Sequence, residues 1–162
     1  MKTILLLRHA KSSWKNERLS DKERPLNKRG LSDASKMAKR FVGKNIWPDL
    51  IISSSSKRTL LTIEYFRKLI ESEHKFISSD QIYLASSEEL LEALSNINEQ
   101  FKVVMLVCHN PGITDLTNYL SNKFVENVPT CGLVGFAYNG LWSDIKQNSC
   151  EFLFFDYPKK LI

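Results

Sequence analysis

Ile4-Leu5-Leu6-Leu7-Arg8-His9-Ala10, near the start of the 162-residue chain, is the stretch that decides its fold. Four consecutive apolar residues that end abruptly in charge are typical of a strand buried on both faces, in the middle of a parallel sheet. Such a strand places Arg8 and His9 at its carboxyl end, where open α/β sheets bind their ligands. An isolated Arg-His pair is more often a surface arginine beside a loop histidine, so the functional interpretation depends on segments further along the chain.

The same arrangement occurs a second time, where the apolar run 103–107 leads directly into Cys108-His109-Asn110-Pro111-Gly112. This run predicts another central strand. Pro111 suits the first turn of the helix expected after it. The sequence therefore places a histidine at the end of each of two buried strands.

Arg58 falls in the first turn of a third segment, a helix expected to begin near Lys57 after the strand 50–53 and its serine run. The helix dipole is positive there by roughly half a charge, so a cation is unfavourable. A basic residue in this position needs a compensating anion, unless its side chain points away into solvent.

Strands alternate with helices along the whole chain. The strands are expected at 4–7, 50–53, 76–77, 103–107, 133–138 and 151–155, and the helices at 31–42, 57–69, 87–97 and 111–120. The apolar face of the first helix consists of Leu31, Ala34, Met37, Ala38 and Phe41. Gly30 is expected to precede this helix, and Ser87 to cap the third. We expect an α/β fold, a three-layer α/β/α sandwich with a mostly parallel central sheet and an antiparallel-capable edge, formed by one domain over residues 1–162.

The composition is that of an ordinary globular protein, with 43% hydrophobic residues, 25% charged residues and a net charge of +5. No apolar stretch approaches the roughly 20 residues of a membrane span. The opening Met1-Lys2-Thr3 lacks the features of a signal peptide, so we expect a cytoplasmic location. Cys108, Cys131 and Cys150 are far apart, which favours reduced thiols over a disulfide framework or a zinc site. No pattern indicates a nucleic-acid partner, a metal or an organic cofactor.

Strand ends gather at one edge of such a sheet, so Arg8, His9, Arg58 and His109 are expected to converge. Two arginines and two histidines make a poor metal site and a good pocket for a phosphoryl group, because each guanidinium matches phosphate oxygens with a rigid fork of donors. One neutral histidine can attack phosphorus in line. The second, if protonated, can donate to a non-bridging oxygen.

Five motifs in order resemble the histidine phosphatase superfamily, with its phosphoglycerate mutase-like fold, and within it the small SixA-type phosphohistidine phosphatases. They are Arg8-His9-Ala10-Lys11-Ser12 with Trp14; Asp21-Lys22-Glu23-Arg24-Pro25-Leu26 leading to Arg29-Gly30; Ser54 with Arg58 and Thr62; Leu106 to Gly112; and Pro129-Thr130 before Gly132. The resemblance implies that His9 is the nucleophile that becomes phosphorylated, and that Arg8, Arg58 and His109 complete the phosphate pocket. Arg24 either lines the rim of the pocket or packs against Asp21.

The departures from the family pattern bear on the substrate. Ala10 and Cys108 stand where the family commonly has glycine; a free Cys in such a strand is far more often a small buried hydrophobe than a nucleophile. The phosphoglycerate mutase and acid phosphatase branches carry a glutamate that protonates the leaving oxygen, and the segment 82–86 has none. A histidine imidazole, with a conjugate-acid pKa of ~6.5, leaves more readily than an alkoxide. The pattern therefore favours phosphohistidine on a protein partner, such as a phosphotransfer domain, as substrate.

Two alternatives remain open at this point. A small-molecule phosphomonoesterase of the same fold would need Glu88, Glu89 or Asp21 as its acid, although Glu88 and Glu89 are typical first-turn helix residues. A non-catalytic phosphate-binding module is disfavoured because both histidines and both pocket arginines are present. The basic loop from Lys11 to Arg29 is consistent with steering an acidic partner, and equally with a solvated loop.

Overall fold

Strand β1 (Lys2–Arg8) lies inside a six-stranded sheet in the computed structural model, which describes residues 1–161. Its apolar side chains alternate between the two faces: Ile4 and Leu6 belong to one core cluster, Leu5 and Leu7 to the other. All four are fully buried, as the unbroken apolar run predicts. The strand that carries Arg8 and His9 is therefore a central one.

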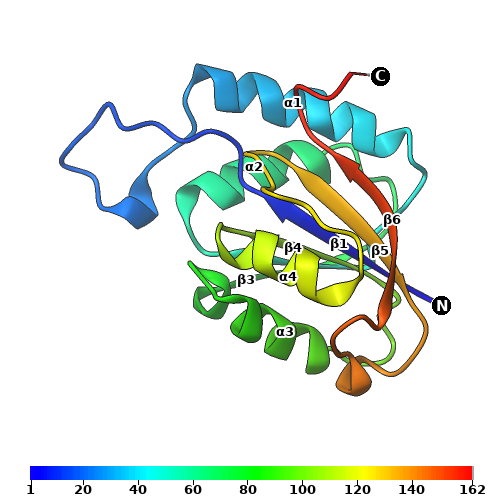
Figure 1. Ribbon diagram of the computed structural model, residues 1–162. Helices are drawn as coiled ribbons and strands as arrows, with labels where there is room; N and C mark the ends of the chain where they lie inside the picture. Colours follow the sequence, from blue (N-terminus) through cyan, green and yellow to red (C-terminus); the bar gives the residue numbers. More distant parts are fainter. Residues whose placement is uncertain (162) are drawn as a thin grey trace.

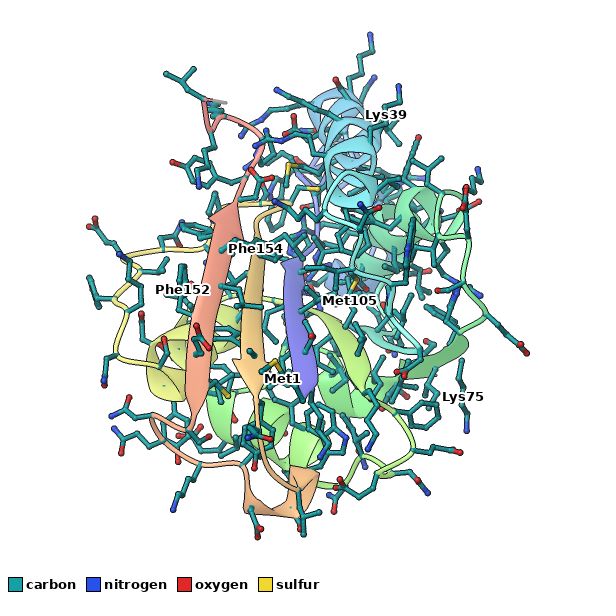
Figure 2. All side chains as sticks on the ribbon, turned by 90° about the vertical axis from the view of Figure 1, so that its right-hand side faces the viewer. Met1, Lys39, Lys75, Met105, Phe152 and Phe154 are labelled. Atoms are coloured by element: carbon teal, nitrogen blue, oxygen red, sulfur yellow. The ribbon has the colours of Figure 1, made fainter. Side chains whose placement is uncertain are left out.

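The sheet has the order β3-β2-β4-β1-β5-β6. Its other strands are β2 (Leu50–Ser54), β3 (Lys75–Ser79), β4 (Val103–Cys108), β5 (Leu133–Tyr138) and β6 (Cys150–Asp156). β1 pairs in parallel with β4, as β2 does with both β3 and β4. β5 and β6 add antiparallel to the other side of β1, so β6 is an edge strand, marked by Phe152 and Phe154 in Figure 2. The expected mostly parallel sheet with an antiparallel edge is confirmed.

Helices cover both faces of the sheet (Figure 1). α1 (Lys28–Val42) and α2 (Lys57–Arg67) pack on one face, where Met105 lies in the shared core (Figure 2). α3 (Ser87–Ser95) and α4 (Gly112–Leu120) pack on the other. This is the three-layer α/β/α sandwich that the sequence predicts. No helix within residues 1–161 is both long and apolar enough to cross a membrane.

The start of α1 differs from the sequence prediction. Gly30 lies inside the first turn rather than before the helix, whose N-cap is Asn27. Gly30 is buried against the loop that follows β1: a Cβ there would lie 2.1 Å from the carbonyl oxygen of Lys11. Leu31, expected on the apolar face, is 41% exposed, because Gly30 takes the inward position one residue earlier.

Four further helix ends differ by one or two residues, among them the end of α3, which is Ser95 rather than about Ile97. α2 ends at Arg67, so Leu69 lies beyond it and is 38% exposed. The N-cap of α3 is Ser86 rather than Ser87, because the Ser86 hydroxyl accepts from the Glu89 amide while the Glu89 carboxylate accepts from the Ser86 amide. Pro111 is the N-cap of α4 rather than a residue of its first turn.

The long loop between β1 and α1 is closed at its base by backbone contacts. Ser12 and Leu26 form an isolated antiparallel bridge, and the Ser13 amide donates to the Pro25 carbonyl at 2.8 Å. The loop includes a short 3₁₀ helix, η1 (Asp21–Glu23), and projects from the body of the molecule at the left of Figure 1. A loop of this length with a fixed base has a defined path rather than behaving as a free linker.

Candidate active site

The two histidines are brought together by the register of the two central parallel strands. Arg8 is the register partner of Cys108, so the residues that follow, His9 and His109, leave the same edge of the sheet side by side. Their ring centroids are 5.1 Å apart. The His9 backbone is held on both sides, since its amide donates to the Cys108 carbonyl and its carbonyl accepts from the Cys131 amide.

The tautomer of His9 follows from its one ring contact. Nδ1 lies 2.7 Å from the Ala10 carbonyl oxygen, which can only accept, so Nδ1 carries the proton. Nε2 therefore keeps its lone pair. The side chain is buried, and this desolvation lowers the pKa of His9 to about 3, with the nearby charges of His109, Arg58 and Arg8 acting in the same direction against the Ala10 hydrogen bond. His9 is neutral near pH 7, as a nitrogen nucleophile must be.

His109 is held between Ser54 and Arg58. Its Nδ1 lies 3.4 Å from Arg58 Nη2, which can only donate, so Nδ1 accepts and Nε2–H donates to Ser54 Oγ at 2.7 Å. Burial, and then the charge of Arg58, lower the pKa of His109 to about 3. Both histidines are thus neutral in the free protein. The protonated His109 that the sequence reasoning considered is not the form of the free pocket.

Arg8 ends β1 and donates from Nη1 to the Val128 carbonyl at 3.0 Å. Its Nε is buried without a hydrogen-bond partner among the described residues, and the same holds for Nε of Arg58. Burial lowers the pKa of Arg8, and the charge of Arg58 lowers it further. Two cations close together, with buried donors uncommitted, favour the binding of an anion at this place.

The compensating anion that Arg58 requires in the first turn of α2 is supplied by Asp21. Arg58 Nη2 donates to Asp21 Oδ2 at 3.0 Å, and Nη1 donates to the Asp21 carbonyl at 2.7 Å. The Arg58 side chain is 3% exposed and that of Asp21 43%. A residue of the projecting loop therefore fixes the orientation of a guanidinium in the pocket.

Asp21 also holds Arg24 and Tyr83. Arg24 donates from Nε and Nη2 to Asp21 Oδ1, at 3.3 and 3.0 Å, and the Tyr83 hydroxyl donates to Oδ2. Burial alone would raise the pKa of Asp21, but the hydrogen bonds from Tyr83, Arg24 and Arg58 outweigh it and hold the pKa well below its usual range. Of the two positions considered for Arg24, the structure shows packing against Asp21. Arg24 is buried and also donates to Ser12 Oγ at 2.6 Å.

Sequence reasoning missed the part played by Asp21 and Tyr83 around the pocket. Tyr83 follows η2 (Asp80–Ile82), and its ring meets that of His109 edge-on, with centroids 5.6 Å apart. The signal for Asp21 was present, since a cation at the start of α2 calls for an anion. The sequence does not show which carboxylate contacts Arg58, because Asp21 and Arg58 are 37 residues apart.

Several other candidates lie outside this arrangement. Cys108 is fully buried in the core, and desolvation raises the pKa of its thiol to about 12, which agrees with the interpretation as a small hydrophobe. Glu88 and Glu89 are exposed at the start of α3. Within residues 1–161 no group of three or more His, Cys, Asp or Glu side chains is arranged to hold a metal ion. The expectation that no cofactor is needed remains a prediction.

Surface cavities also occur away from the two histidines. Several surface cavities of about 140 to 720 Å³ in the described part of the chain are lined by residues other than His9 and His109. The largest lies between the segment after α4 and β6. The two histidines are themselves buried, at 7% exposure for His9 and 2% for His109.

A nitrogen nucleophile beside buried guanidinium donors is the arrangement expected of an enzyme that transfers phosphoryl groups. Comparison with protein families gives the same class: residues 4–78 match the Histidine phosphatase superfamily (branch 1). The chain belongs to this superfamily. The match includes Arg8, His9 and Arg58, and ends before His109.

Individual relatives extend the likeness over nearly the whole chain. An uncharacterized chloroplastic protein of Arabidopsis thaliana is 30% identical over 151 residues, which cover 87% of this chain and 69% of that protein. The crystal structure of a candidate phosphohistidine phosphatase SixA from Agrobacterium tumefaciens has a TM-score of 0.85 and 26% identity, covering 97% of this chain and 98% of that one. A protein histidine phosphatase SixA complexed with tungstate has a TM-score of 0.82, with 96% and 97% of the two chains covered; at 16% identity it supports the fold alone.

Proposed function

We propose that this protein hydrolyses phosphohistidine on a partner protein, through a phosphorylated His9. Membership of the histidine phosphatase superfamily supports phosphatase activity. The roles of individual residues and the nature of the substrate are the proposal. It rests on the tautomer of His9, the uncommitted guanidinium donors and the carboxylates near the pocket.

In the first step, Nε2 of His9 attacks the phosphorus atom in line. The new bond joins Nε2 to phosphorus while the bond from phosphorus to the leaving nitrogen breaks, and the substrate ring, protonated by solvent on its other nitrogen, leaves as neutral imidazole. The Ala10 carbonyl, already bonded to Nδ1–H, stabilises the positive charge that develops on the ring. Arg8 and Arg58 hold the non-bridging oxygens, and their uncommitted Nε atoms are available for this.

In the second step, water attacks the phosphorylated His9, the bond from Nε2 to phosphorus breaks, and inorganic phosphate leaves. In the free protein, His109 has its Nδ1 beside Arg58 Nη2. Its partner Ser54 has a hydroxyl that accepts or donates, so a proton on Nδ1 can be accommodated when an anion is bound. An anion beside the ring would raise the pKa of His109 from its value in the free pocket.

Whether a carboxylate near the pocket can donate a proton bears on the choice of substrate. Among the described residues Asp21 is the carboxylate that contacts the pocket, and its low pKa makes it a poor proton donor at neutral pH. Glu89 is engaged in the N-cap of α3. Burial, and then the hydrogen bond to Asp21, raise the pKa of the Tyr83 hydroxyl. An alkoxide leaving group needs a proton donor, and Asp21 is a poor one, whereas a phosphohistidine ring protonated on its other nitrogen leaves as neutral imidazole.

The alternative of a small-molecule phosphomonoesterase shares the fold. A candidate α-ribazole-5′-phosphate phosphatase of Escherichia coli has a similar structure, with a TM-score of 0.71 at 13% identity. The ion-paired Asp21, a poor proton donor at neutral pH, favours phosphohistidine over this alternative. A cytoplasmic location and the identity of the partner remain predictions.

The decisive experiment compares release of phosphate from a phosphohistidine-bearing protein and from an aryl phosphate, with a chelator present. We expect wild-type protein to prefer phosphohistidine strongly and His9→Ala to be inactive. His74→Ala is the matched control, since His74 contacts Arg67 and Ser72 instead of the pocket. Mass spectrometry after an alkaline quench should find the phosphoryl group on His9. Preference for the ester, or activity that survives His9→Ala, would contradict the proposal.

A further inference from the structure

We infer that residues 13–20 of the projecting loop are the docking surface for an acidic face of the phosphohistidine-bearing partner. Trp14 is the anchor of this surface. This inference rests on the proposed function and says where the partner binds. It is carried by the exposure and fixation of Trp14, by the free cations around it, and by the position of the loop beside the pocket.

Trp14 is exposed and yet held in place. Its side chain is 70% exposed, an unusual state for so large an apolar group. One face of the indole lies on the guanidinium of Arg24, whose Cζ is 3.5 Å from the ring centroid. Arg24 is itself fixed by Asp21 and Ser12. A rigid aromatic with one free face loses little conformational entropy on binding, which is the property of an interface hot spot.

The charges around Trp14 favour an acidic partner. Lys11, Lys15 and Arg18 are exposed, and among the described residues none of them forms an ion pair. Glu17 is the acidic residue between them. The cations nearer the pocket, by contrast, are already paired: Arg24 with Asp21 and Lys22 with Asp80. A second copy of this chain, with its net charge of +5, would be repelled rather than attracted.

The loop begins close to the pocket. Only Ala10, Lys11 and Ser12 separate His9 from the loop, and the Ala10 carbonyl and the Ser12 hydroxyl connect it to His9 and Arg24. Beside Trp14, residues Ser13, Lys15 to Leu19 and Pro25 line a surface hollow of about 680 Å³. We expect a protein whose phosphohistidine reaches His9 to cover this hollow, whereas a small phosphate ester would not extend to it.

The test uses two substrates that share the same leaving group. One is an acidic phosphotransfer domain phosphorylated on histidine, and the other is the amide of acetylated phosphohistidine. The measured quantity is the ratio of kcat/KM for the protein to kcat/KM for the amide. We expect Trp14→Ala to lower this ratio at least about tenfold, mainly through KM for the protein. Lys15→Glu, which does not touch Arg24, should also lower it and should weaken its dependence on ionic strength.

Phe124→Ala is the matched control, because Phe124 is also an exposed aromatic, at 75%, but lies in the segment after α4. It should leave the ratio unchanged. An unchanged ratio in Trp14→Ala, or an equal fall in Phe124→Ala, would overturn the docking surface while leaving the proposed function intact. Wild-type protein that releases no phosphate from the domain would refute the proposed function, and the docking surface with it.

Discussion

Replacing Asp21 by Asn should separate the positioning of Arg58 from the chemistry of His9. The substitution removes the negative charge that holds Arg58, Arg24 and the Tyr83 hydroxyl, and it keeps the shape of the side chain. The backbone carbonyl of Asp21 still accepts from Arg58 Nη1. Arg58 should therefore stay near the pocket with its guanidinium misaligned.

The size of the effect follows from these contacts. A preorganised donor that is lost altogether costs about 10²–10³ in kcat, and Arg58 is displaced here rather than removed, so we expect kcat to fall about 10- to 100-fold. A hydrogen bond to a charged group contributes about 1.5–3 kcal/mol when buried. The Asp21 side chain is 43% exposed, so solvent screening reduces the expected loss in the free energy of unfolding to about 1–2 kcal/mol.

The assay measures kcat and KM on phosphohistidine, and the affinities for vanadate and phosphate by calorimetry. Misalignment of Arg58 predicts a larger loss of affinity for vanadate, which resembles the five-coordinate transition state, than for phosphate. A partly unfolded sample would lower kcat without changing either affinity. Glu23→Gln is the control, because it makes the same change of charge in η1 and its side chain contacts only Ser20. Asp21→Asn behaving like Glu23→Gln in kcat and in vanadate affinity would refute the reasoning.

Three further predictions concern the supports of the pocket. Gly30→Ala should lower the free energy of unfolding by about 1–3 kcal/mol in chemical denaturation, because its Cβ would overlap the Lys11 carbonyl, whereas Gly43→Ala, whose nearest contact is 3.4 Å, should have little effect. Ser54→Ala removes the partner of the second histidine and should lower kcat about tenfold in the phosphohistidine assay; an unchanged kcat would show that this hydroxyl is dispensable. The pocket histidines have pKa values of about 3 in the fold and 6.5 in the unfolded chain. The unfolded chain therefore binds more protons in this range, and the free energy of unfolding should decrease as the pH is lowered from 6.5 to 3. Each contributes up to about 1.4 kcal/mol per pH unit, and His9→Asn should make this slope shallower by that amount in urea titrations; an unchanged slope would contradict the low pKa.

Local apolar patterns predict most of the fold. Unbroken runs such as 103–107 indicate strands because little else buries consecutive apolar residues, and those strands are present. The sequence predictions are wrong where a contact from another part of the chain determines which residue faces inward or which residue caps a helix. Leu31 is exposed because the close approach of the Lys11 carbonyl makes Gly30 the inward residue, and no helical periodicity contains that information. Ser86 replaces Ser87 as N-cap because both positions offer a hydroxyl, and the reciprocal bond with Glu89 selects between them.

The candidate site also contains residues that the sequence predicts and a residue that it does not. Arg8, His9 and His109 end strands, so the sheet topology alone brings them together. Arg58 follows for the same reason, from the end of β2 and the start of α2. Asp21 could not be placed, because its position depends on the path of an irregular loop. Side-chain contacts with Arg24, Arg58 and Tyr83 fix that path, and none of them leaves a periodic signal in the sequence.

The central position of β1 and β4 has a consequence for local stability. Amides of these strands are paired on both sides and covered by both helical layers, so they should exchange with solvent hydrogen only through global unfolding. The projecting loop is held by backbone bonds only at its base and by side chains beyond it, so its outer amides should exchange through local openings. Mild denaturant would then separate Asp21 from Arg58, and with it the segment that carries Trp14, while His9 and His109 stay in register. Recognition and chemistry thus lie on parts of the chain that unfold at different free energies.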